Sequence, residues 1–292
     1  MADTLTANVA ESVNEMIHAT IKLVPHKVIM PNLVTKVTIE KGYDRVDIPR
    51  VNSTPTILNP TEGDELTVSS QFDLTSTTIQ PTHRAVMVRL HERATYFSKE
   101  NLIAVVSDWL AQAEGRDMDT DLTAEFANFG TGNDVGTTNT DLTIAVVRQS
   151  RRLLFANTIA NGGPAPTPLY CVISPLVEEN LYTNLGLQGV VGSTSPWIPQ
   201  GMSQELIESY FVDRILGVPL FRDGYMTEDA SSDFICSMFS KESLMLAISK
   251  NWDMKTFEVP NWIGVILRAV ADYNSGIRAF PLWGSQITAD GA

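Results

Sequence analysis

The stretch from Val46 to His83 constrains the fold more than any other part of the sequence. Its apolar residues alternate with serine and threonine, which is the period of a β-strand, and prolines interrupt the run. No lysine or arginine occurs between Arg50 and Arg84. Strands of this composition have no core of their own to cover. We therefore expect a long two-stranded excursion that packs against something outside itself.

The size and cysteine content of the chain exclude several classes of protein. With 292 residues, 43% of them apolar and 19% charged, the chain can enclose one large or two modest cores. Its two cysteines, Cys171 and Cys236, lie in apolar runs and are too few for a disulfide framework, which indicates folding under reducing conditions. The sequence has no signal-peptide pattern and no apolar run near the roughly 18 residues that cross a bilayer. We expect neither secretion by a signal peptide nor contact with a membrane.

The formal net charge of -13 is unevenly distributed. Residues 1–50 contain six basic and six acidic side chains, so the whole deficit lies beyond residue 50. An acidic body disfavours general binding to polyanions. The basic cluster outside the N-terminal region consists of Arg148, Arg151 and Arg152. On a helix Arg148 and Arg152 share a face, and ion pairs between subunits and phosphate contact are equally open roles for the cluster.

Helical and strand periods alternate irregularly along the chain, which predicts a mixed α+β fold. We expect strands from residue 84 onward and over 169–173, the latter followed by a helix that Ser174 caps and Pro175 begins. Helices are expected from Ser98 to Gly115, over 116–130 as a second piece that continues the first, over 141–157 and over 203–216. Residues 130–140 are expected to form a loop. Late strands are expected over 233–240, 243–249 and 254–260, and as a final pair over 262–285 that turns at Asn274 to Gly276.

The residues that carry most enzyme chemistry lack the required spacing. The four histidines, His18, His26, His83 and His91, do not form a zinc pattern. The glycines of 130–136 do not match a phosphate-binding loop, and no Gly-x-Ser-x-Gly elbow is present. We assign no catalytic, cofactor-binding or metal-binding residue.

One acidic run invites a calcium-loop interpretation. It comprises Glu114, Asp117, Asp119 and Asp121, but it lacks the central glycine and closing glutamate of such a loop. A solvated acidic face is the favoured interpretation, with a weak cation site as the alternative.

The order of these segments resembles the major capsid protein family of tailed bacteriophages, which has the Hong Kong 97 fold. The segments "VDIPRV" and "TEGDELTVSS" are similar to the two sides of that family's extended loop. The segment "YCVISPLVEENL" is similar to its strand followed by a helix that begins with Ser-Pro. The resemblance covers nearly the whole chain and rests on the order of patterns.

The resemblance implies a Hong Kong 97-like α+β fold in four parts. Residues 1–38 would form an N-terminal arm and residues 39–82 an extended β-hairpin loop. Residues 83–136 and 262–292 would form a peripheral domain with a long spine helix, and residues 137–261 an axial domain.

The resemblance also implies a function. Subunits of this family assemble into pentamers and hexamers that close into an icosahedral shell around double-stranded DNA, so the chain would be a structural protein of the virion, assembled in the host cytoplasm. Portal and scaffolding proteins would be partners, and a cement or decoration protein is left open. No cofactor and no sequence-specific DNA binding is implied. The extended-loop residues expected to contact another subunit are Ile48, Pro49, Val51, Pro55, Ile57, Leu58 and Leu66.

Some members of this family join neighbouring subunits by an isopeptide bond from a lysine of the extended loop. No lysine occurs between Val51 and His83, so we expect a non-covalent shell. Two other functions remain open from the sequence. The first is an encapsulin-like shell of a cellular compartment, and the second is a cytoplasmic enzyme that uses Cys171 or the acidic run.

Overall fold

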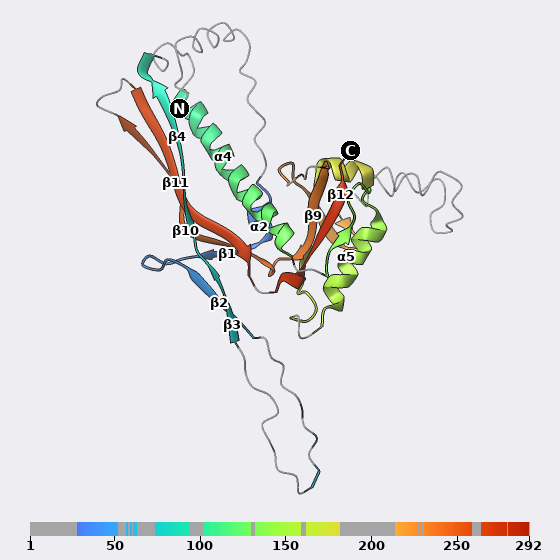
Figure 1. The fold of residues 1–292 in the computed structure, drawn as a ribbon. Helices are drawn as coiled ribbons and strands as arrows, with labels where there is room; N and C mark the ends of the chain where they lie inside the picture. The colour runs from blue at the N-terminus through green and yellow to red at the C-terminus, as the bar shows by residue number, and fades with distance from the viewer. Residues whose placement is uncertain are drawn as a thin grey trace.

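The computed structural model describes residues 28–51, 57, 59, 61–62, 74–93, 102–129, 132–158, 162–181, 214–226, 228, 231–258, 264–278 and 280–291. The predicted mixed α+β class is confirmed: the described chain forms a four-stranded, a six-stranded and a two-stranded sheet with two long helices. Figure 1 shows an elongated sheet with a helix along it, a second α+β unit beside it, and a projecting hairpin. Of the helix predicted over 203–216, residues 203–213 lie outside the described residues. Its predicted end is wrong, because Arg214–Ile215 form a short strand. No helix in the described ranges is long and apolar enough to cross a lipid bilayer.

The elongated sheet has the strand order β1-β10-β11-β4. Its strands are β1 (Thr35–Thr38), β4 (Thr82–His91), β10 (Leu244–Glu258) and β11 (Gly264–Ile277). Strand β11 is antiparallel to both β10 and β4, whereas β1 is parallel to β10. Helix α4 (Leu102–Ala124) lies along one face (Figure 1), where Leu110 packs with Leu90 and Leu267 in a buried apolar cluster.

Helix α4 passes through Gly115, so the prediction that this glycine ends a first helical section is wrong. The helix continues to Ala124 and is followed by the 3-10 helix η1 (Glu125–Asn128). A Cβ atom at Gly115 would lie 2.3 Å from the Val28 Cγ2 atom. The glycine therefore permits a close approach of residue 28 to the helix, and it does not end the helix.

The six-stranded sheet has the order β5-β12-β9-β6-β8-β7. Its strands are β5 (Val135–Gly136), β6 (Leu169–Ile173), β7 (Arg214–Ile215), β8 (Val218–Arg222), β9 (Asp233–Ser240) and β12 (Gly284–Asp290). Helix α5 (Ile144–Ala156) packs against it and begins after Thr143, whose hydroxyl accepts a hydrogen bond from the Val146 amide at 3.4 Å. Strand β6 has the predicted bounds, and the helix that follows it begins at residue 175 as predicted.

One large apolar core joins this unit to the elongated sheet. It includes Leu154 of α5, Phe126 of η1 and Phe239 of β9, with the two aromatic rings 5.5 Å apart. It continues to Leu246 on β10 and Tyr273 on β11. The two larger sheets therefore share buried side chains.

Three predictions about the late strands and the glycine loop are wrong. Strand β10 is a single strand with register shifts between Ile248 and Asp253, where two strands were expected. Strand β11 continues through Asn274 to Gly276 without turning, and a Cβ atom at Gly276 would lie 2.8 Å from the Ile79 Cδ1 atom. The expected loop over 130–140 contains β5, which pairs in parallel with β12.

The N-terminal part of the described chain forms regular structure. Residues Met30–Leu33 form the short helix α2, with Pro31 in its first turn, where its missing N–H costs nothing. Strand β1 follows and adds to the edge of the elongated sheet. Residues 28–38 thus pack against their own subunit.

The two-stranded sheet is a hairpin of β2 (Val46–Val51) and β3 (Leu74–Ile79) that extends away from the two larger sheets (Figure 1). Its pairing runs from Val46 opposite Ile79 to Val51 opposite Leu74. At its base Ile79 packs with Ile39, Met245 and Ala247, and Val46 and Ile48 cover this small core. Among the described residues of the hairpin, Val51, Ile57 and Leu74 lie beyond this base and are exposed.

Candidate functional site: inter-subunit surfaces

The outer part of the β2–β3 hairpin exposes apolar side chains. Val51 and Leu74, which pair at its outer end, are 45% and 54% exposed, and Ile57 beyond them is 87% exposed. Exposed clusters of this kind mark surfaces that contact other proteins. Polar side chains of the two strands form hydrogen bonds with each other: the Arg50 Nε–H group donates to the Thr75 hydroxyl at 3.1 Å. The hairpin thus presents an apolar surface on a hydrogen-bonded scaffold.

The structure separates the predicted loop-contact residues into three groups. Val51, Ile57 and Pro49 are exposed and available for contact. Ile48 is half-buried against the small core at the hairpin base, so it packs at least partly within its own subunit. The predicted contacts at Pro55, Leu58 and Leu66 lie outside the described residues.

The hairpin meets the elongated sheet beside a cavity of about 740 Å³. Residues of β3, β11 and η1 line it, and among them the Asn274 side-chain amide donates a hydrogen bond to the Gln80 carbonyl at 2.9 Å. This bond and the packing of Ile79 over Gly276 fix where the hairpin leaves the sheet.

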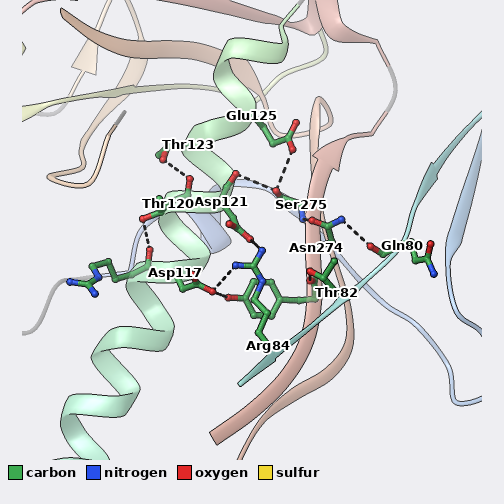
Figure 2. A network of polar contacts seen from close by, with 12 residues as sticks. Gln80, Thr82, Arg84, Asp117, Thr120, Asp121, Thr123, Glu125, Asn274 and Ser275 are labelled. Carbon is green, nitrogen blue, oxygen red and sulfur yellow. Dashed lines mark hydrogen bonds and ion pairs between the residues drawn. The ribbon is translucent and has the colours of Figure 1, made fainter. Parts of the chain in front are cut away.

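A polar network ties α4 to the elongated sheet, as Figure 2 shows. The Arg84 side chain of β4 donates to Asp117 at 2.8 Å and forms an ion pair with Asp121. The Tyr273 hydroxyl of β11 also donates to Asp117, and the Arg84 guanidinium lies 4.9 Å from the centre of the Tyr273 ring. The network therefore joins two strands to two successive turns of the helix.

Burial changes the ionisation of this network. It raises the pKa of Asp121 despite the neighbouring Arg84. Burial and the hydrogen bond to Asp117 raise the pKa of Tyr273, which therefore stays protonated as a donor. For Arg84, burial works to lower the pKa, but Asp121 and Asp117 outweigh it and raise that pKa. The guanidinium keeps its charge in this site.

The prediction of a solvated acidic face over residues 114–121 is wrong. Asp119 is fully buried and accepts hydrogen bonds from the backbone amides of Ile29 at 3.2 Å and Met30 at 3.1 Å. Glu114 has one carboxylate oxygen buried without a hydrogen-bond partner, and burial raises its pKa. The acids lie in separate environments around the helix, and no described group of three His, Cys, Asp or Glu side chains is placed to hold a metal ion.

The two cysteines are buried as free thiols. Cys171 is 1% exposed and Cys236 is fully buried, and they lie on β6 and β9 of the six-stranded sheet. Burial raises the pKa of the Cys171 thiol, and it raises the pKa of Cys236 to about 12. A neutral, inaccessible thiol is a poor nucleophile.

The three arginines of the predicted basic cluster lie on α5. Arg148 and Arg152 are exposed, and Arg151 is partly buried with its guanidinium 5.6 Å from the centre of the Phe155 ring. In the described part of the chain, none of the three forms an ion pair with a carboxylate. Figure 1 shows α5 on the side of the six-stranded unit away from α4. The cluster is therefore available to a partner.

Sequence reasoning missed two features that position these surfaces. One is the Arg84 network, whose members lie far apart in sequence and carry no spacing signal. The other is the capping of α2 by Asp119, since a carboxylate in the middle of a helix gives no sign that it reaches a distant backbone.

Comparison with known proteins identifies the fold. No protein-family model matches the sequence, and no curated protein matches it. Among solved structures, the capsid structure of cyanophage P-SCSP1u is similar at 12% identity and a TM-score of 0.68, covering 94% of this chain and 92% of that one. A structure described as Mycobacterium phage Che8 is similar at 12% identity and a TM-score of 0.71, covering 92% and 94%. An encapsulin complex from Synechococcus elongatus is similar at 10% identity and a TM-score of 0.63, covering 96% and 95%.

The chain therefore has the fold of shell-forming capsid proteins. Within that class, the predicted Hong Kong 97-like fold of tailed-phage major capsid proteins is confirmed, because the likeness extends along almost the whole of both chains.

Proposed function

We propose that this protein is a major capsid protein, the subunit of an icosahedral shell built from pentamers and hexamers that encloses double-stranded DNA. The observation that carries the proposal is the likeness in fold to capsid structures across 92% to 94% of this chain. Portal and scaffolding proteins are the proposed partners, and the virion is the proposed location, after assembly in the host cytoplasm.

The exposed hairpin supports assembly. Val51, Ile57 and Leu74 expose apolar surface that a neighbouring subunit would cover. Weak contacts of this kind, repeated throughout a closed shell, give large collective stability. The net charge of -13 also fits a container that does not hold its DNA tightly.

Strand pairing suggests a refined division into structural parts. Strand β10 lies in the elongated sheet and β12 in the six-stranded sheet, although the sequence-based boundaries place them in the axial and peripheral parts respectively. We assign β10 to the peripheral part with α4, and β12 to the axial part with α5. The hairpin β2–β3 remains the extended loop.

A non-enzymatic role agrees with the chemistry of the candidate residues. Cys171 is buried with a raised pKa, and Asp117, Asp119 and Asp121 are engaged in structural hydrogen bonds and ion pairs. These contacts give the side chains a structural role within the subunit.

The similarity to an encapsulin complex supports a second candidate, a cellular shell that holds a protein cargo. Similarity in fold does not distinguish a viral capsid protein from an encapsulin-like protein, because the sequence identities of 10% to 12% are equally low. The content of the particle distinguishes these two functions.

The test is negative-stain electron microscopy of the expressed protein, alone and with the products of neighbouring genes, followed by nuclease treatment and analysis of the particle content. Closed shells with nuclease-protected double-stranded DNA are expected. Shells that contain an enzyme cargo and no DNA would support the encapsulin-like function. A stable monomer or dimer under all conditions would overturn both. We also propose a non-covalent shell, so boiled particles should give a single band at the mass of one chain on a denaturing gel.

A further inference from the structure

Opposite charges lie on the two flanks of helix α5, with two aspartates of the preceding segment beside one flank and two arginines of the helix on the other. Val146 and Gln149 line a pocket of about 320 Å³ whose other lining residues include Asp134 and Asp141, both exposed. Arg148 comes two residues after Val146, and Arg151 comes two residues after Gln149. Two residues correspond to about 200° of rotation around an α-helix. The arginines therefore leave the helix on the flank opposite the acidic pocket.

The arginine flank has the composition of a contact surface. Phe155, 41% exposed, lies beside the partly buried Arg151 at 5.6 Å. Arginine and aromatic residues are enriched where proteins meet. Arg148 is exposed on the same flank, and neither guanidinium has a carboxylate partner among the described residues. Two unpaired cations beside an exposed aromatic ring on an acidic protein favour an acidic partner over solvent alone.

The pocket offers the matching chemistry. It combines the Asp134 and Asp141 carboxylates with the hydroxyl-bearing side chains of Thr137 and Thr140. A guanidinium presents several N–H donors in a planar fork that fits carboxylate oxygens.

We propose that Arg148 and Arg151 of one subunit bind the Asp134–Asp141 pocket of the next copy of this chain. This head-to-tail contact uses different surfaces on the two partners, and repeated by rotation it closes a ring. It rests on the proposed function, because it assigns a contact within the rings from which the shell is built. The arginine flank and the acidic pocket have complementary charges, which favours a second copy of the chain as the partner. Binding of the arginines to DNA would leave the acidic pocket without a role.

The test is charge reversal followed by recombination. Arg148→Glu/Arg151→Glu and Asp134→Lys/Asp141→Lys should each leave the subunit folded, as judged by circular dichroism and the thermal unfolding midpoint. Each should raise the protein concentration needed for assembly at least about tenfold, because like charges then face each other across the contact. The chain with all four substitutions should regain assembly, since each contact again pairs opposite charges.

Lys36→Glu/Lys41→Glu is the matched control. It makes the same change in net charge at two exposed lysines that lie outside helix α5, so assembly should change little. Equal loss of assembly in this control, or no rescue in the fourfold variant, would overturn the contact. Normal assembly of Arg148→Glu/Arg151→Glu shells that no longer retain DNA would also overturn it, in favour of phosphate contact. If the unaltered protein forms no rings or shells, the proposed function fails instead.

Discussion

The carboxylate of Asp119, in the middle of α4, accepts a hydrogen bond from the backbone amide of Met30 at 3.1 Å, across 89 positions of sequence. The same carboxylate accepts from the Ile29 amide at 3.2 Å. These amides begin the short helix α2 and have no partner within it. Asp119 thus fastens the N-terminal part of the described chain to the long helix.

Asp119→Ala should destabilise the subunit by about 1–3 kcal/mol, because it leaves buried amides unpaired. Chemical denaturation of the unassembled subunit measures the change. Asp108→Ala, at an exposed position of the same helix, is the control and should change the unfolding free energy by less than about 0.5 kcal/mol. Equal values for the two variants would contradict the capping role.

Gly115→Ala should destabilise the subunit, although alanine is the better helix former. The added Cβ would lie 2.3 Å from the Val28 Cγ2 atom, and overpacking of this kind costs about 1–3 kcal/mol. Denaturant unfolding gives the value.

The sign should reverse in a Val28→Ala background. Removing the Val28 methyl groups makes room for the added Cβ, so Gly115→Ala should then be neutral or stabilise by up to about 1 kcal/mol. The same loss in both backgrounds would show that the close approach is not what requires glycine.

Stability should depend on pH through Glu114. Burial raises the pKa of this carboxyl, so the folded chain binds its proton more tightly than the unfolded chain. As pH rises from about 4, the unfolded value, through the raised pKa, the folded state loses stability. Glu114→Gln should therefore gain stability relative to the unaltered protein across this window and keep the gain at neutral pH.

Unfolding curves at a series of pH values test the Glu114 prediction. Asp108→Asn, which removes an exposed carboxylate from the same helix, should give a smaller change. A Glu114→Gln variant that is less stable at pH 7 than at pH 4, relative to the unaltered protein, would contradict the assignment.

Two isoleucines should separate folding from assembly. Ile57→Asp, at a side chain that is 87% exposed, should change the subunit's unfolding free energy by less than about 0.5 kcal/mol and impair assembly. Ile48→Asp should destabilise the subunit itself, because this side chain covers the small core at the hairpin base. Light scattering and denaturant unfolding of both variants give the comparison, and a reversed order would refute the division of the hairpin.

The sequence predicted those elements whose signals are local. Strand β6, with the Ser174-Pro175 start of the next helix, and α5 follow from turn chemistry and helical period, and the alternating residues of β4 predicted its strand. Gly115 and Gly276 misled the prediction, because a glycine that permits close packing looks the same in sequence as one that ends a helix or forms a turn. Only the positions of Val28 and Ile79 distinguish the two.

The candidate surfaces were predicted in outline. The alternation in residues 46–83 and the lack of lysine and arginine after Arg50 predicted a hairpin that contacts another subunit, and Arg148, Arg151 and Arg152 were singled out by their charge. The partners of Arg84 and Asp119 could not be predicted, because they come from strands and turns that only the fold brings together. The acidic pocket beside α5 likewise depends on how residues 134–141 pack against the helix.

Electron microscopy of the chain lacking residues Thr54–Asp64, beside the unaltered chain, tests the central claim most directly. The unaltered chain should form closed shells, whereas the shortened chain should remain folded, with an unchanged unfolding midpoint, and form none. Intact shells from the shortened chain, or no shells from the unaltered one, would contradict the account.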